Sequence, residues 1–472
     1  MKKKLIFLIA FLSSFNLQAR SLLDGYLPSN SNYDSRVKQS EVSKFIDKNI
    51  SGAIGSSYVS SDSGERKNSF AKLRFDNDNK YSRVVLAGQF VDSEIELNQK
   101  NSLSAEERTV AYSYDDPEIL ESYIDLKLMK NLTLSAGVRK IVWGQFEPFS
   151  PIDFSLPIYF SRNFVEYTKQ EGRVPKETYS LTYFPHPKIE LSGYFFPEYE
   201  VDPIIERINQ DDEVTMPIGS GLHQSAGRLM FYPEFATFGF TYFNGFSHMD
   251  NSKGYIYDSS TSSYQKNPFL IENEMVGFEF SKKLGKYGLK FEYSISDTVT
   301  DLVNNIAGNS GYQSWVTNQN NNELYVDGDL HFGAAGIDFA SGLWNYDFMV
   351  YYYEIKYDEE AQQGVDYDEI INNDDEEGPT GIGSFLPSFN ISRYITDAKN
   401  TKAGLAVGVL GVGQGAATYV TGTINESFKW MVAAEYLEYF ANMMIDEAYD
   451  DGNFEAEDDM MFGLRASIQY NF

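Results

Sequence analysis

The residue types that most often catalyse reactions or hold metals are few and scattered in this chain. It has no cysteine and four histidines, His186, His223, His248 and His331, and no two of them have the spacing of a metal pair. No G-x-S-x-G nucleophile motif occurs. The glycines between Gly408 and Ala416 resemble a dinucleotide motif in spacing only, and glycines that relax the packing of a strand explain them better. We therefore expect no enzyme, no metal site and no cofactor.

Charged side chains recur instead at alternate positions of segments whose other positions are apolar. If the apolar positions face lipid, the charged positions face an interior, where charges are tolerated because they line water. This parity predicts as pore-lining residues Lys72, Arg74, Arg83, Glu121, Asp125, Lys127, Arg139, Arg228 and Arg465. The same face is expected to carry Lys290, Glu279, Glu292 and Glu435.

Two interpretations of these charges stay open. Most of the basic residues fall on early strands, and Arg465 falls on the last strand, which would close beside the first, so they could form a positive arc on one wall. Alternatively they pair with Glu121 and Asp125 and stiffen the barrel.

The segment from Gly144 to Lys176 differs from the other long polar segments because it is rich in proline and aromatic residues. That composition suits a segment folded against protein. Its place after the fifth strand matches the loop that narrows the pore in general porins, and a surface lid is the competing idea. If it enters the interior, we expect Glu147, Asp153 and Arg162 at a constriction, opposite Arg74 and Arg139.

A second distinctive segment is acidic. Between Asp358 and Glu377 there are ten carboxylates and no basic residue. Divalent cations held by oxygen ligands are physically reasonable there, but the spacing fits no calcium loop. A solvated surface is the simpler interpretation, and bridging to lipopolysaccharide through divalent cations is a hypothesis.

The elements that would position these residues are strands. In the last residues Phe462, Leu464, Ile468 and Tyr470 share one face, and polar residues alternate with them. Apolar alternation also runs through Ile124–Val138 on both sides of a two-residue turn. Tight turns are predicted at 76–80, 130–131, 185–187, 233–235, 283–286, 341–344 and 425–427, and long polar segments at about 92–117, 144–176, 197–223, 247–272, 297–327, 358–402 and 443–458.

Short turns at one end and long loops at the other are typical of outer-membrane barrels. With a short first loop near 61–68, the pattern predicts an all-β, transmembrane, antiparallel up-and-down barrel of about 16 strands. A further hairpin within 380–415 would give the alternative of 18 strands.

The two ends of the chain predict export and assembly. Three lysines, a short apolar run and small residues up to Ala19 have the layout of a signal peptide, residues 1–19. Residues 20–49 would be a periplasmic segment or partial plug, and 50–472 the barrel. The terminal Phe472, with Tyr470 before it, resembles the signal that the barrel-assembly machinery reads.

Composition supports a membrane barrel. The chain has 34 tyrosines and 35 phenylalanines, and barrels need aromatic girdles at both interfaces. Past the signal no apolar stretch could cross a membrane as a helix. The formal charge of −29 becomes −32 when the three signal lysines are removed, so nucleic-acid partners are excluded.

A family resemblance follows from the stretch Gly137–Phe154, with its Gly, Arg, Trp-Gly, aromatic, Pro and Asp order, and from the stretch that begins at Ala236. These resemble porin-like outer-membrane proteins of the alginate-export type and their uncharacterised relatives. The resemblance implies a monomeric barrel that conducts a solute, without specifying the solute. Its members are expected to have a strongly basic conduit, unlike the mixed charges here.

Together these features predict a porin-like channel in the cell outer membrane for passive or substrate-selective diffusion of small hydrophilic solutes. Its expected partners are outer-membrane lipid, lipopolysaccharide and the solutes. The alternatives are a binding protein or adhesin with acidic extracellular loops, or an outer-membrane enzyme.

Overall fold

The computed structural model of the chain describes the strands and their short connections. The described residues are 49–61, 64–100, 107–114, 117–146, 150–153, 174–199, 219–246, 255–258, 263–266, 272–301, 325–357, 384–395, 400–410, 413–425, 427–439 and 461–471. The predicted signal peptide, nearly all of the segment 20–49, the acidic segment 358–377 and Phe472 lie outside these residues.

The described residues form 21 strands. They are β1 (Ile50–Ser61), β2 (Gly64–Asp78), β3 (Ser82–Lys100), β4 (Glu107–Tyr114), β5 (Pro117–Met129), β6 (Leu132–Arg139), β7 (Lys176–His186), β8 (Ile189–Tyr199), β9 (Gly219–Phe231), β10 (Thr237–Phe246), β11 (Tyr255–Asp258), β12 (Ser263–Lys266), β13 (Glu272–Leu284), β14 (Tyr287–Asp301), β15 (Tyr325–Ser341), β16 (Trp344–Tyr357), β17 (Ser384–Tyr394), β18 (Thr401–Leu410), β19 (Gly413–Asn425), β20 (Phe428–Tyr439) and β21 (Met461–Asn471).

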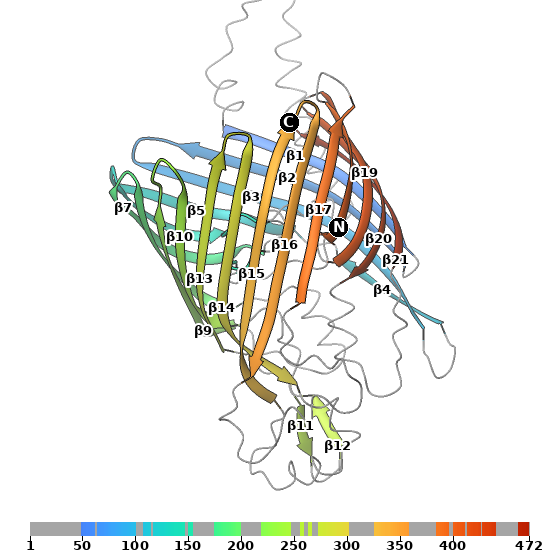
Figure 1. The fold of residues 1–472 in the computed structure, drawn as a ribbon, viewed down its shortest axis with the longest axis horizontal. Helices are drawn as coiled ribbons and strands as arrows, with labels where there is room; N and C mark the ends of the chain where they lie inside the picture. The colour runs from blue at the N-terminus through green and yellow to red at the C-terminus, as the bar shows by residue number, and fades with distance from the viewer. Residues whose placement is uncertain are drawn as a thin grey trace, which may run out of the picture. The chain divides into compact units, whose positions relative to one another are not determined.

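All strands except the separate hairpin of β11 and β12 belong to one antiparallel sheet that closes on itself (Figure 1). Neighbouring strands of the circuit follow one another along the chain, with β3 next to β5 and β10 next to β13. β21 closes the circuit by pairing with β1 in a register that sets Ala53 opposite Asn471. β4 does not extend the circuit, because it pairs with the part of β3 beyond β5. The circuit is therefore a closed barrel of 18 strands.

The all-β barrel is confirmed, and the alternative count of 18 strands replaces the main count of 16. The extra hairpin lies where the sequence was ambiguous, in β17 and β18, which are joined at Ile395–Asn400. Glycines and alanines weaken the alternation of β18 and β19, so the sequence signal there is faint. The strands are also longer than expected: 92–100 and 107–114, assigned to a loop from the sequence, belong to β3 and β4.

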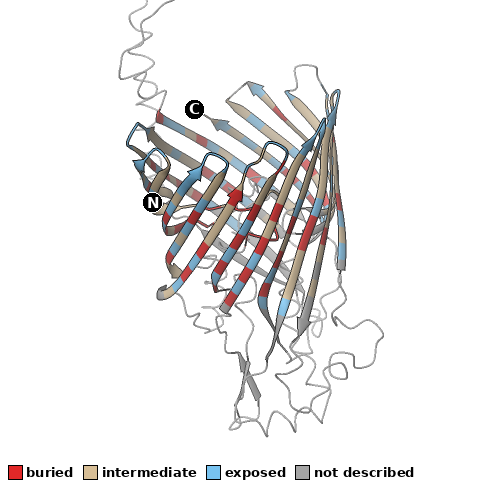
Figure 2. Ribbon diagram, turned by 60° about the vertical axis from the view of Figure 1, so that its left-hand side comes forward, coloured by how far each residue is buried: buried red, intermediate tan, exposed pale blue. Residues whose placement is uncertain are grey.

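Alternation decides which side chains face each side of the sheet. In β21 the side chains of Phe462, Leu464 and Ile468 are about half exposed, whereas that of Arg465 is buried. Figure 2 shows buried and exposed residues alternating along many strands. Because the exposed positions are apolar, the outer face is suited to hydrocarbon and the opposite face encloses the polar side chains.

A buried ion pair lies next to the seam of the barrel. Nη2 of Arg465 on β21 donates to Oε2 of Glu435 on β20 at 2.7 Å, and Nε lies 2.7 Å from Oε1. Their side chains are only 5% and 7% exposed. Removing one partner would leave a buried charge without its counter-ion.

We expect Glu435→Leu to lower the free energy of unfolding by about 3–5 kcal/mol. Adding Arg465→Met to that variant should recover most of the loss, because no charge then remains buried. Urea unfolding in lipid vesicles, followed by tryptophan fluorescence, measures both. As a control, Lys188→Gln removes the exposed pair Lys188–Glu234 and should cost less than about 1 kcal/mol. Equal losses in the control and the Glu435 variant would contradict the assignment.

Candidate functional site

One sector of the inner face, on β2, β3, β5 and β6, carries a network of opposite charges. We call it the charged wall; it consists of Lys72, Arg74, Asp76, Asp78, Arg83, Glu121, Asp125, Lys127 and Arg139. Strand register explains why they meet. Arg74 and Glu121 flank Ala87, their common cross-strand neighbour on β3. Because alanine is small, the two side chains can reach each other across it.

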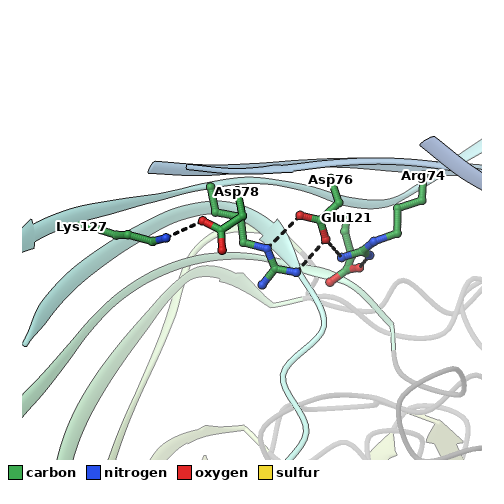
Figure 3. Close-up of polar contacts among 6 residues, drawn as sticks. Arg74, Asp76, Asp78, Glu121 and Lys127 are labelled. Atoms are coloured by element: carbon green, nitrogen blue, oxygen red, sulfur yellow. Dashed lines mark hydrogen bonds and ion pairs between the residues drawn. The ribbon is translucent and has the colours of Figure 1, made fainter. Parts of the chain in front are cut away.

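The ion pairs run along the charged wall (Figure 3). Arg74 binds Glu121 and also donates to Asp76 at 3.0 Å. Arg83 donates two hydrogen bonds to the same carboxylate of Asp76, from Nε at 2.9 Å and from Nη2 at 2.7 Å. At the turn end Lys127 binds Asp78 and donates to the carbonyl of Asn79 at 2.8 Å.

Arg139 and Asp125 continue the network on β5 and β6. Arg139 lies 3.9 Å from Asp125 and stacks over the ring of Tyr123 at 4.9 Å. Gly137 allows the backbones of β6 and β5 to approach closely, because a Cβ there would lie 2.7 Å from the Cα of Tyr123. Ser135 donates to Asp125 at 2.6 Å. A guanidinium is thus held between an aromatic face and a carboxylate.

The charged wall is partly accessible and nearly neutral. The side chains of Arg74, Arg83 and Lys127 are 33–36% exposed. Five basic residues face four acidic ones. The positive arc expected from the sequence is therefore offset by Asp76 and Asp78 as well as by Glu121 and Asp125, and the pairing interpretation describes the contacts better.

The other candidate lining residues lie in pairs on other strands. Arg228 on β9 binds Glu279 on β13, whose side chain is 1% exposed. Lys290 lies 3.0 Å from Asp338, and Arg465 is buried against Glu435. In the charged wall itself, Lys72 stacks over the ring of Phe70 at 4.5 Å. Arg228 and Arg465 thus offer little surface to the interior.

The chain after β6 lies against the inner face of a different sector. We call residues 140–146 and 150–153 the inward segment. Its Ile141, Trp143 and Ile152 are buried in a cluster with Phe196, Ala226, Phe243 and Met275, which belong to β8, β9, β10 and β13. Since the alternate residues of β10 and β13, such as Phe240 and Val276, are exposed outside, the cluster lies within the barrel.

Aromatic contacts and small residues fit the inward segment to the strands. Trp143 packs edge-on against Tyr194 at 5.5 Å, and Phe146 against Tyr351 at 6.1 Å. A Cβ at Gly277 would lie 2.7 Å from Ile152, and one at Gly336 would lie 2.9 Å from Phe146. The strands therefore leave space for these two side chains.

Polar contacts hold the same segment to β14. The buried carboxylate of Glu292 accepts hydrogen bonds from the backbone N–H of Gln145 and the hydroxyl of Ser150. Ser294 donates to the carbonyl of Pro151 at 2.6 Å. Gly144 has a φ of +75°, and a Cβ there would lie 2.7 Å from both carboxylate oxygens of Glu292. Only glycine fits this position without strain.

The three expected constriction residues cannot all be placed. Asp153 is buried, 6% exposed, at the end of the inward segment, whereas Glu147 and Arg162 lie outside the described residues. Sequence reasoning missed Asp76, Asp78 and the anchoring residues Trp143 and Phe146, and it assigned Glu292 to the inner face without predicting its contacts. The first two could have been found, because positions 74, 76 and 78 share one face of β2.

Among the described residues, no group of three or more histidine, cysteine, aspartate or glutamate side chains is arranged so that it could hold a metal ion. None of the helical structure within the described ranges is long and apolar enough to cross a membrane.

Comparisons with known proteins give a fold likeness only. No protein-family model and no curated protein matches the chain. Solved structures that resemble it include OccK5 (OpdH) of Pseudomonas aeruginosa, at 9% identity and a TM-score of 0.45, covering 90% of this chain and 97% of that one. OccAB1 of Acinetobacter baumannii shares 11% identity with a TM-score of 0.44, covering 90% and 96%. OmpT of Vibrio cholerae, described as an outer membrane protein, shares 8% with a TM-score of 0.42, covering 90% and 96%.

Three features define the structural class of the protein: the sheet closes on itself, apolar side chains lie outside, and charged side chains lie inside. The described strands form an antiparallel transmembrane β-barrel of 18 strands with an apolar outer face. The comparisons do not single out the alginate-export type.

Proposed function

We propose that the barrel is a channel for diffusion of small hydrophilic solutes. The observation that carries the proposal is the arrangement of the inner face: a partly exposed charged wall on β2–β6 and an inward segment fixed to β8–β16. An adhesin with a filled barrel would gain nothing from solvent-exposed ion pairs along its inner wall. The inward segment would narrow the path without closing the sector that carries the charges.

The charges would control passage by electrostatics. Side chains of both signs along one wall orient polar and zwitterionic solutes, and their near balance favours weak selectivity for small ions. A strongly basic conduit, which polysaccharide export would need, is not supported by five basic and four acidic residues. Glu147 and Arg162 remain proposed members of the constriction, together with Asp153.

Planar-bilayer recording tests this proposal. We expect steady single-channel currents from the purified, folded protein in potassium chloride, and currents that fall when an uncharged sugar of pore size is added. A folded protein that passes no current would overturn the proposal and favour an adhesin or an outer-membrane enzyme.

A further inference from the structure

Four aromatic rings form a continuous row on the outer face of the barrel, at the turn end of β14, β15 and β16 (Figure 1 shows these strands side by side). The ring of Tyr287 lies 5.2 Å from that of Phe339, which stacks on Tyr346 at 4.7 Å and 16°. Trp344 adds a fourth ring, 6.3 Å from Tyr346. Tyr287 and Trp344 are 38% and 40% exposed.

A basic side chain covers each end of this row. Nζ of Lys286 lies 5.3 Å from the ring of Tyr287 and 5.6 Å from that of Phe339. At the other end the guanidinium of Arg393 on β17 lies 5.4 Å from the ring of Trp344, its cross-strand partner. We call these six residues the rim cluster.

Within the part of the chain that the structure describes, no carboxylate pairs with Lys286 or Arg393. This contrasts with the charged wall, where four basic residues pair with carboxylates. In a chain whose formal charge is −29, two cations that stand beside exposed rings and have no carboxylate partner among the described residues are the features expected of a site that contacts an anion.

The position of the rim cluster indicates which kind of anion lies within its reach. Phe291 and Phe348, on the same outer face, are 40% and 38% exposed, so this face borders lipid. Short turns lie at the periplasmic end of outer-membrane barrels, where the leaflet is made of phospholipid. Aromatic rings settle at the level of the headgroups, and cations beside them lie at the depth of the phosphates.

We propose that the rim cluster binds anionic phospholipid of the periplasmic leaflet in preference to zwitterionic phospholipid. The acyl chain lies along the rings between Tyr287 and Trp344, and Lys286 and Arg393 contact the headgroup region from the two ends.

The test is retention of lipid by the full-length barrel. The purified protein in detergent is incubated with equal amounts of phosphatidylglycerol and phosphatidylethanolamine, and bound lipid is counted by native mass spectrometry. The wild type is expected to retain phosphatidylglycerol preferentially. Lys286→Gln with Arg393→Gln should weaken that preference roughly 30-fold, since each basic residue near an anionic surface contributes about fivefold.

A control removes the same charge elsewhere on the turns. Lys130→Gln with Lys188→Gln deletes two exposed lysines outside the rim cluster and should leave the preference intact. Wild-type retention by the rim variant, or an equal loss in the control, would overturn the proposal. Folding is checked by the mobility shift on heating in dodecyl sulfate, and if the double variant does not fold, each single variant is expected to lose about fivefold.

Discussion

Removing the rings that fix the inward segment is expected to raise the single-channel conductance at least about twofold. The reason is that the segment is then no longer held inside the lumen, where it narrows the path. The variant is Trp143→Ala with Phe146→Ala. Both side chains are 1% exposed, and burying an aromatic side chain of this kind stabilises by about 3–5 kcal/mol relative to alanine. Once both are lost, the segment is held by Ile141, Ile152 and its hydrogen bonds to Glu292 and Ser294. The current should also become noisier.

A second variant reaches the same end without deleting a contact. Gly144→Ala places a methyl group against the carboxylate of Glu292 and forces alanine into a φ of +75°. Both effects weaken the attachment of the inward segment, so this variant should also raise the conductance. Phe240→Ala is the matched control, since that ring is half exposed on the outer face and should leave the current unchanged. Unchanged conductance in both segment variants would show that the inward segment does not restrict the pore.

The barrel could be predicted from the sequence because its main determinant is local. Alternate side chains point to opposite faces of a strand, so Phe462, Leu464 and Ile468 identify the outer face without knowledge of any partner strand. The seven turns were found for the same reason. The hairpin of β17 and β18 was left ambiguous because glycine and alanine give β18 little contrast between its faces.

The contacts of the interior were harder to predict because they depend on register. Arg74 meets Glu121 only because Ala87 lies opposite both, and the pairing of β3 with β5 shifts between Ala87 and Gly88. A shift of one residue would have turned Glu121 to the other face. Glu292 was assigned to the interior by parity, but its contacts with Gln145 and Ser150 join residues more than 140 positions apart, and no local pattern reveals them.

Reversing two charges of the charged wall is the second prediction of large effect. Arg74→Glu with Arg139→Glu turns five basic and four acidic residues into three and six. A unit charge about 4 Å from an ion in water contributes about 1 kcal/mol. The permeability of potassium relative to chloride should therefore rise roughly fivefold or more, measured as the shift of the reversal potential in a potassium chloride gradient.

The ion pair supplies the control. Arg74→Glu with Glu121→Arg exchanges the partners across Ala87, keeps the net charge and can re-form the pair, so its reversal potential should stay near that of the wild type. The shift in the double-glutamate variant should shrink in concentrated salt, because the screening length falls to about 3 Å at 1 M. A reversal potential that does not move at low salt would mean that solutes do not pass along β2–β6, and the path would then have to be sought along another sector of the inner face.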